Sequence, residues 1–204
     1  MDGAVLKQRI CDALTVLIES ENELRDLDQV LGDGDLGITI AAGSKAVIAA
    51  LEQLPADTSP PDIARASAKA FANANPSTMA ALVAGGLLAG SKTWAGVTDV
   101  TVAHAQAFVE AATAGISQRG RAQVGDKTIV DGLDAVATAL VGVSDATGAT
   151  DRAVAAAADA VERTRGLQSQ RGRASWLQER SVGHADPGSV ALARFLEAWR
   201  DSAN

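Results

Sequence analysis

The fold and the chemistry of this chain are both indicated by one stretch, residues 27–37, which reads Leu27-Asp28-Gln29-Val30-Leu31-Gly32-Asp33-Gly34-Asp35-Leu36-Gly37. It places three carboxylates, Asp28, Asp33 and Asp35, within eight residues and among three glycines. Like charges this close raise each other's pKa and destabilise a compact loop unless a cation lies between them. Carboxylate oxygens suit hard divalent cations, and Mg²⁺ bound together with phosphate is a common biological use. The stretch therefore predicts a metal site.

An apolar-periodic run begins at Ile38, directly after the acidic stretch. We expect this run to form a helix, so the acidic loop leads into a helix N-terminus. The first backbone N–H groups of a helix have no partner inside it, and they favour anions. Metal-binding carboxylates beside such a helix end predict a site for a metal bound to a nucleotide.

Other interpretations of the same letters fit less well. The spacing Gly32-x-Gly34-x-x-Gly37 matches a dinucleotide-binding pattern, but that pattern needs a preceding strand and a helical pattern precedes it here. A calcium-binding EF-hand loop starting at Asp33 needs an oxygen ligand at its fifth position and Glu at its twelfth, which are Gly37 and Ser44. The remaining alternative is a solvated acidic turn that binds nothing.

Composition bounds the class of protein. The 204 residues fit one domain, and 47% hydrophobic with 21% charged residues is ordinary for a folded chain. Aromatic residues make up only 3% and Tyr is absent, which favours packed helices over a sheet. The net charge of −7 argues against a nucleic-acid or anionic-membrane surface. Because no apolar run reaches membrane length and no leader pattern opens the chain, we expect a cytoplasmic protein.

Helical spacing of apolar residues predicts a single all-α domain over residues 1–204, a bundle of about eight antiparallel helices without strands. Two helix starts carry local signals: Thr128 with Asp131 fits a capping box, and Asp186-Pro187 fits an N-cap followed by proline. In an up-and-down bundle, the loops around Asp35, Thr78 and Asp186 are expected to gather at one end. The expected helices cover residues 3–25, 38 to before Pro55, 62–73, 78–94, 100–116, 128–140, 150–165 and 187 onward, with a helical turn at 174–178.

Three motifs, in this order, resemble the L subunit, or nucleotide-binding domain, of dihydroxyacetone kinases. They are Asp28-x4-Asp33-Gly34-Asp35, then Gly125-Asp126-Lys127-Thr128-x2-Asp131, then Gly172-Arg173-Ala174-Ser175-Trp176-Leu177-x-Glu179-Arg180-Ser181-Val182-Gly183-His184-x-Asp186-Pro187-Gly188. The resemblance implies a barrel of eight antiparallel helices that holds ATP or ADP with two Mg²⁺ ions at one end. It also implies that the sugar is held by a separate K-type subunit or domain.

Matching these motifs residue by residue implies roles for twelve positions. Asp28, Asp33 and Asp35 would bind the two Mg²⁺ ions and carry the catalysis, because phosphoryl transfer depends mainly on positioning and charge compensation. The remaining nine would bind the nucleotide: Gly37, Ile38 and Thr39 at a helix start, Thr78 where the family has a phosphate-binding serine, Ser77 beside it as a second hydroxyl donor, Ile129 where a methionine usually packs on adenine, and Gly125, Arg180 and Asp186 around the pocket.

The chain departs from the family pattern in two places. Leu36 stands where the family commonly has His, and Asn75-Pro76-Ser77-Thr78-Met79 replaces a loop of the form Gly-Gly-(Thr/Ala)-Ser-Gly. Fewer glycines restrict how closely the backbone can wrap a phosphate. Arg173, in contrast, is interpreted only as a solvated charge or a partner contact.

The function expected from the resemblance is an Mg²⁺-dependent subunit that transfers phosphoryl to a small ketose on a K-type partner. Two versions are compatible with it: an enzyme that uses ATP, and one in which ADP stays bound and a phosphotransferase-system protein rephosphorylates it. A homodimer is compatible with either. The alternative from another class is a non-catalytic regulatory or interaction module that keeps the helical fold.

Overall fold

The computed structural model describes residues 1–202, and over them the chain is helical without strands, so the predicted all-α single domain is confirmed. No helix of this part combines the length and apolar character that a membrane crossing requires. The elements are α1 (Gly3–Ile18), α2 (Glu21–Leu31), α3 (Leu36–Glu52), α4 (Pro60–Ala74), α5 (Thr78–Thr93), α6 (Val102–Gly120), α7 (Ile129–Ala139), α8 (Ala146–Arg165), the 3₁₀ helix η1 (Arg173–Ser181) and α9 (Pro187–Asp201).

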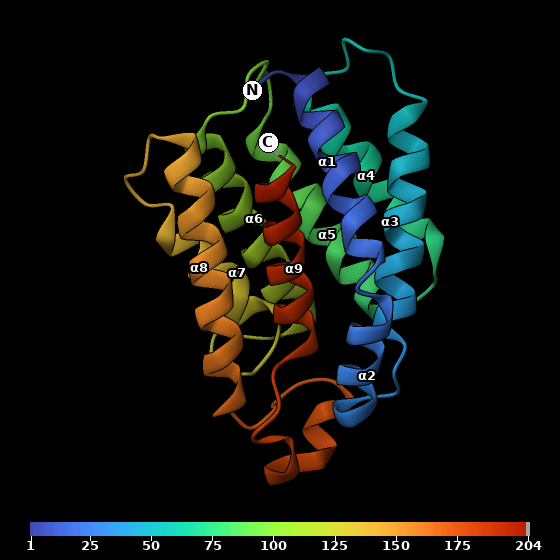
Figure 1. The fold of residues 1–204 in the computed structure, drawn as a ribbon, viewed down its shortest axis with the longest axis vertical. Coiled ribbons are helices and arrows are strands. Elements are labelled where there is room, and N and C mark those ends of the chain that lie inside the picture. The colour runs from blue at the N-terminus through green and yellow to red at the C-terminus, as the bar shows by residue number, and fades with distance from the viewer. Residues whose placement is uncertain (203–204) are drawn as a thin grey trace.

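Eight helices of the described part form a closed ring (Figure 1). Each of α3 to α9 packs against the next, and α1 closes the ring because it contacts both α3 and α9. The short α2 continues from α1 and packs on α3 and α9. Neighbours in the ring run in opposite directions, so the loops that precede α3, α5, α7 and α9 all lie at one end, at the bottom of Figure 1. We call this the acidic end, since it holds Asp28, Asp33 and Asp35.

Small residues let the helices approach closely. A Cβ added at Gly43 of α3 would lie 2.3 Å from the Phe71 ring of α4, and one at Gly90 of α5 would lie 2.7 Å from the Phe108 ring of α6. The largest fully buried side chains include Leu24, Leu51 and Ile63. This explains how a chain with few aromatic residues fills its core: glycine and alanine accommodate the large side chains of the facing helix.

The expected single helix over residues 3–25 is wrong. The chain breaks it at Glu19 and Ser20, and α2 then continues to Leu31. The break is hidden in the sequence because Leu17 and Leu24, seven residues apart and both buried, keep helical spacing across it. As a consequence Asp28 lies in the last turn of α2 rather than in a loop, and the acidic loop is limited to residues 32–35.

The predicted caps agree with the structure. Thr128 and Asp131 form the capping box of α7, and Asp186 caps α9 by accepting a 2.7 Å hydrogen bond from the Ser189 N–H, with proline next. The start of α8 was expected at residue 150 but lies at Ala146, because the Asp145 side chain caps it by accepting from the Gly148 N–H at 2.6 Å.

The pKa of the Asp186 carboxyl lies above its usual value. Burial raises its pKa from 3.8 to about 6, and the charge of Asp131 acts in the same direction. The hydrogen bonds from Ser189 and Gly188 oppose this rise without cancelling it. The carboxyl is therefore protonated in the folded protein at a pH where it is ionised in the unfolded chain.

Gly37 gives a prediction on packing. A Cβ there would lie 2.1 Å from the Glu21 carbonyl oxygen and 2.8 Å from the Arg25 backbone nitrogen, both on α2. We expect Gly37→Ala to lower the free energy of unfolding by about 1–3 kcal/mol, because backbone cannot yield as a flexible side chain can. Urea unfolding followed by circular dichroism measures it. The control is Gly85→Ala on α5, where the nearest atom is Arg119 Cδ at 3.6 Å; equal stability of the two variants would contradict the prediction.

Asp186 gives a prediction on pH. Between 3.8 and about 6 the unfolded chain has released this proton while the folded protein still holds it, so the contribution of Asp186 to stability falls as pH rises through that window. Asp186→Asn lacks the titration and retains a capping side chain. The stability of the variant relative to the native chain should therefore increase by roughly 1–3 kcal/mol from pH 4 to pH 7. A difference that does not vary with pH, in urea unfolding at each pH, would disprove the assignment.

Candidate functional site

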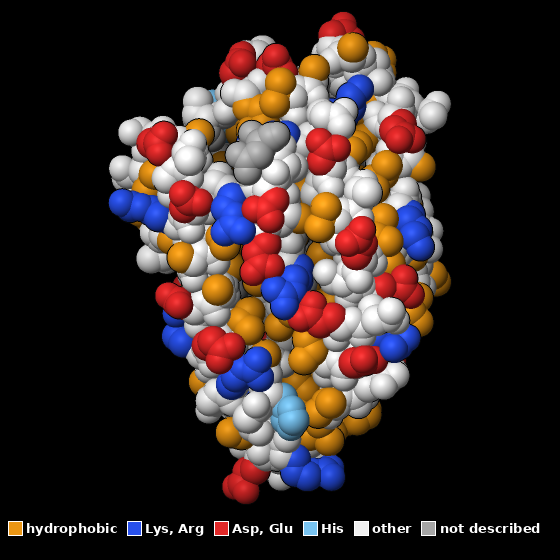
Figure 2. All heavy atoms as spheres, viewed as in Figure 1, with side chains coloured by type: hydrophobic (Ala, Val, Ile, Leu, Met, Phe, Trp, Pro, Cys, Tyr) orange, Lys and Arg blue, Asp and Glu red, His pale blue; other side chains and the backbone are white. Residues whose placement is uncertain are grey.

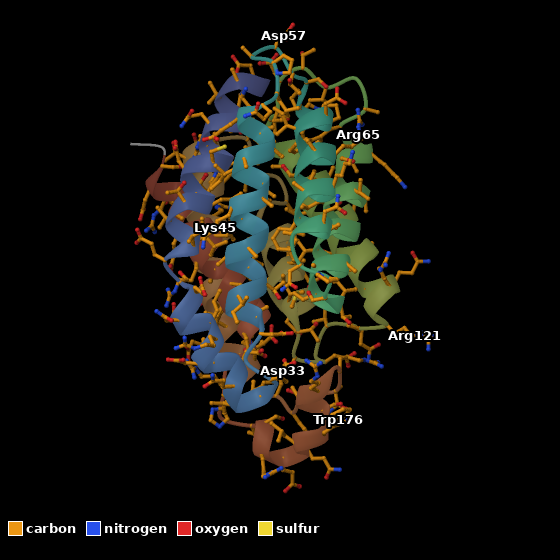
Figure 3. All side chains as sticks on the ribbon, turned by 90° about the vertical axis from the view of Figure 1, so that its right-hand side faces the viewer. Asp33, Lys45, Asp57, Arg65, Arg121 and Trp176 are labelled. Carbon is orange, nitrogen blue, oxygen red and sulfur yellow. The ribbon has the colours of Figure 1, made fainter. Side chains whose placement is uncertain are left out.

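The three acidic residues of the opening stretch come together at the acidic end. One carboxylate oxygen from each of Asp28, Asp33 and Asp35 lies within 4.8 Å of the others. Asp28 is contributed by the last turn of α2, Asp33 by the loop, and Asp35 by the N-cap position of α3. Figure 3 shows Asp33 at the end of the barrel opposite Asp57. Asp28 is half-buried and the other two are exposed, so the cluster opens to solvent.

Glycines and a hydrogen bond between the Leu36 N–H and the Asp28 carboxylate fold the acidic loop back onto α2. Gly34 has φ +77°, a left-handed conformation that L side chains rarely adopt, and it reverses the chain between Asp33 and Asp35. A Cβ at Gly32 would lie 2.6 Å from the Asp28 carboxylate. That carboxylate in turn accepts a 3.3 Å hydrogen bond from the Leu36 N–H, which ties α2 to the start of α3. The glycines at positions 32 and 34 therefore allow the three carboxylates to come close to one another.

The cluster has the electrostatics of a cation site. Burial raises the pKa of Asp35, and the charges of Asp33 and Asp28 raise it further, whereas Arg173 lowers it. A divalent cation among the three would relieve this repulsion, and three carboxylates fit the oxygen preference of Mg²⁺. Figure 2 shows acidic and basic side chains interspersed over one face of the molecule, without a large area of a single charge. The three neighbouring carboxylates therefore form a local concentration of negative charge.

Arg173 is a contact that the sequence pattern did not reveal. This first residue of η1 forms an ion pair with Asp33, across 140 residues of chain. Arg180, the arginine expected at the nucleotide, is exposed and makes no ion pair with any residue of the described part. Its role stays a prediction. The position of Arg173 within the same C-terminal motif was the only signal available for it.

The residues expected at the phosphates lie at the starts of α3 and α5. Gly37 and Thr39 are buried in the first turn of α3, and Ile38 between them is half exposed. The Thr39 hydroxyl accepts a 3.0 Å hydrogen bond from the Asn75 side chain, which joins the loop before α5 to α3. Ser77 caps α5 by accepting from the Ala80 N–H at 3.0 Å, and Thr78 next to it is exposed. Both loops thus present helix N-termini at the acidic end.

The residues expected around the base lie at the starts of α7 and α9. Gly125 is exposed at φ +93°, and its N–H donates to the Asp131 carboxylate at 2.6 Å. Ile129 is the first residue of α7 and is half-buried. The Ser189 hydroxyl, just after the Asp186 cap, donates to the Thr128 carbonyl at 3.2 Å and so joins the two helix starts. All twelve predicted positions therefore belong to this end, in four segments far apart in sequence.

Comparison with known proteins identifies the family of this chain. The family model described as the DAK2 domain matches residues 30–201. The chain is 34% identical to the "PEP-dependent dihydroxyacetone kinase 1, ADP-binding subunit DhaL" of Listeria innocua, over 88% of this chain and 86% of that one. It is 35% identical to the L-erythrulose 1-kinase of Mycolicibacterium smegmatis, over 90% of this chain but only 33% of that longer protein.

A solved structure shares the fold. The dihydroxyacetone kinase from C. freundii, in complex with AMP-PNP and Mg²⁺, superposes with a TM-score of 0.78 at 24% identity, over 99% of this chain and 34% of that one. The family model covers most of the sequence, and the relative from Listeria exceeds 30% identity over nearly its whole length. The resemblance carried by the three motifs is confirmed, and this chain belongs to the DAK2 domain family of dihydroxyacetone kinases.

Proposed function

We propose that this chain binds ADP or ATP together with Mg²⁺ and is the L-type nucleotide-binding subunit of a dihydroxyacetone-kinase-like enzyme. The observation that carries the proposal is the approach of three carboxylates to within 4.8 Å beside the N-terminus of α3. The name of the Listeria relative, an ADP-binding subunit, supports the choice of nucleotide. We assign this role to residues 1–204 as one domain, because the helices of residues 1–202 form one closed ring.

Under this proposal the acidic end divides its work between side chains and backbone. Asp28, Asp33 and Asp35 hold two Mg²⁺ ions, which when bound offset the charge of the transferred phosphoryl group. The N–H groups of Gly37 and Ile38 donate to phosphate oxygens, as free N–H groups at a helix start do. Thr39, Ser77 and Thr78 add hydroxyl groups from α3 and α5.

The nucleotide base is assigned to the neighbouring loops. Ile129 offers an apolar side chain at the start of α7, where the family usually packs a methionine on adenine. Gly125 has no side chain and nothing lies within 4 Å of the position of its Cβ, so the backbone there is open to a flat ligand. Arg180 and Asp186 complete the pocket in this assignment.

The sugar is assigned to another protein. The chain spans 86% of the Listeria ADP-binding subunit but 33% of the longer L-erythrulose 1-kinase, so the length it shares with its relatives is that of the L subunit. A K-type partner therefore holds the ketose. Relatives named PEP-dependent and PTS-dependent support a version in which bound ADP is rephosphorylated by a donor protein. Tightly held ADP in the purified protein would favour that version over exchange with free ATP.

The nucleotide part of the proposal is tested with Asp35→Asn. Replacing one carboxylate by an amide removes a charged oxygen ligand at nearly constant size, and we expect Mg-ADP to bind at least about tenfold more weakly. Isothermal titration calorimetry with ADP, with and without Mg²⁺, measures the change. Asp26→Asn is the control, because Asp26 is an exposed carboxylate on α2 that pairs with Arg25 and is not part of the acidic cluster. Native protein that shows no Mg²⁺-dependent ADP binding would favour the non-catalytic module instead.

The partner part of the proposal has its own test. The isolated chain with Mg-ATP should phosphorylate neither dihydroxyacetone nor erythrulose, because the sugar site lies on the partner. Phosphate transfer is followed by ³¹P nuclear magnetic resonance, and addition of a K-type subunit should start it. Turnover by the isolated chain would contradict the need for a partner while leaving nucleotide binding intact.

A further inference from the structure

The segment from Leu167 to Ser181, which we call the cap segment, covers the acidic end without a core of its own. It contains η1, contacts α2, and brings Arg173 to Asp33. Its only fully buried residues are two serines, Ser169 and Ser181, and its large aromatic residue, Trp176, is 79% exposed. Figure 3 shows Trp176 beyond Asp33 at the tip of the molecule. Because apolar burial is nearly absent, polar contacts must hold this segment in place.

Lys127 supplies the contacts at the two ends of the cap segment. It is 3% exposed, and its ammonium donates hydrogen bonds to the carbonyl oxygens of Leu167, at 3.0 Å, and of Ser181. It makes no ion pair with a carboxylate of the described part, and burial lowers its pKa. Its φ of +61° is also a left-handed conformation that a residue with a side chain seldom adopts. Lys127 thus combines a buried charge with a left-handed backbone conformation, and both are unfavourable. The same residue holds both ends of the cap segment through its two hydrogen bonds.

Asp126, the neighbour of Lys127, holds the middle of the same segment. Its backbone carbonyl accepts from the Gln170 N–H at 3.0 Å, and its carboxylate accepts from Arg171 Nε at 2.7 Å. The Asp126 side chain is 7% exposed, so the ion pair is largely shielded from solvent on that side. Arg171 lies two residues before Arg173. The contact therefore fixes the chain just ahead of the residue that reaches the acidic cluster.

The cap segment also closes on itself at its base. The Ser169 N–H donates to the Ser181 hydroxyl at 2.9 Å, and the Gly183 N–H, just past its end, donates to the Arg165 carbonyl at 2.7 Å. Lys127 bonds to Ser181, which takes part in this closure, and to Leu167, which lies two residues before Ser169. Its ammonium is thus engaged by main-chain carbonyls at the base of the cap segment.

We infer that Asp126 and Lys127 are positioning residues: they clamp the base of the cap segment so that Arg173 is held at the Asp28–Asp33–Asp35 cluster. The functional importance of this clamp rests on the proposed function, because η1 brings Arg173 to Asp33, one of the proposed metal ligands. The clamp itself is a property of the chain without any ligand. It acts through backbone carbonyls and one ion pair, and it assigns Lys127 no contact with the nucleotide.

The first experiment measures the clamp in the absence of nucleotide. Lys127→Met removes the ammonium and keeps an unbranched side chain of similar length. We expect amide hydrogen exchange of residues 168–183 to become at least about tenfold faster, while exchange in α3 to α6 stays unchanged. Lys45→Met, at an exposed lysine in the middle of α3 (Figure 3), should change neither. Unchanged exchange of the cap segment in a folded Lys127→Met protein would overturn the inference.

A second variant keeps the inference testable if Lys127→Met does not fold. Arg171→Gln removes only the ion pair to Asp126, at an exposed arginine, and leaves Lys127 in place. Exchange of the amides around Gln170 and Arg173 should then increase by about threefold or more, without a change at the helices. Exchange equal to that of the native chain would count against the clamp.

A double-mutant cycle separates positioning from a direct role. Mg-ADP dissociation constants are measured for the native chain, Lys127→Met, Arg173→Gln and the double variant. If Lys127 acts through Arg173, the double variant binds about as weakly as the weaker single variant. Effects that multiply would show an independent role for Lys127 and overturn the inference. If the native chain does not bind Mg-ADP, the proposed function fails, and the exchange experiment still decides whether the clamp exists.

Discussion

The contact between α2 and the first turn of α3 at Gly37 is the constraint on which the acidic end depends. With no side chain at Gly37, the backbone of α3 reaches that of α2 at Glu21 and Arg25. Asp28 is on α2, whereas Asp35 caps α3, so the separation of the two helices sets the separation of the two carboxylates. A larger residue at this contact would push the carboxylates apart. The packing of α2 against α3 therefore also sets the distance between the carboxylates of Asp28 and Asp35.

Charge compensation is the second constraint on this end. The chain has a net charge of −7, so its general field does not attract an anionic nucleotide. Within the described part, the ion pair of the acidic cluster joins Asp33 to Arg173. Arg173 belongs to the cap segment, which lacks buried apolar side chains. Fixing a cationic side chain there requires contacts elsewhere, and Asp126 and Lys127 supply them at the base. Electrostatics at the tip of the cap segment thus depends on hydrogen bonds at its base.

The features that sequence patterns predicted are those with local causes. The capping box of Thr128 and the proline after Asp186 are read within a few residues, and both are present. The break after α1 was missed because the buried Leu17 and Leu24 keep helical spacing across it. The Arg173–Asp33 pair joins residues 140 positions apart, and Lys127 bonds to main-chain carbonyls, which any residue type provides. Contacts of these two kinds leave no pattern in a single sequence, so the cap segment's attachment was not predictable.

The loop at residues 75–79 shows how the chain accommodates its departure from the family pattern. Where the family has flexible glycines, this chain has Asn75-Pro76 followed by Ser77. The Asn75 side chain donates to the Thr39 hydroxyl, and the Ser77 side chain caps α5. Side-chain hydrogen bonds thus fix a loop that glycines would leave free to adapt to a ligand. Leu36, at the other departure, is buried in the core, and this burial holds the start of α3 in place. Contacts within the chain thus fix both positions: Asn75 and Ser77 are held by hydrogen bonds, and Leu36 is held by burial.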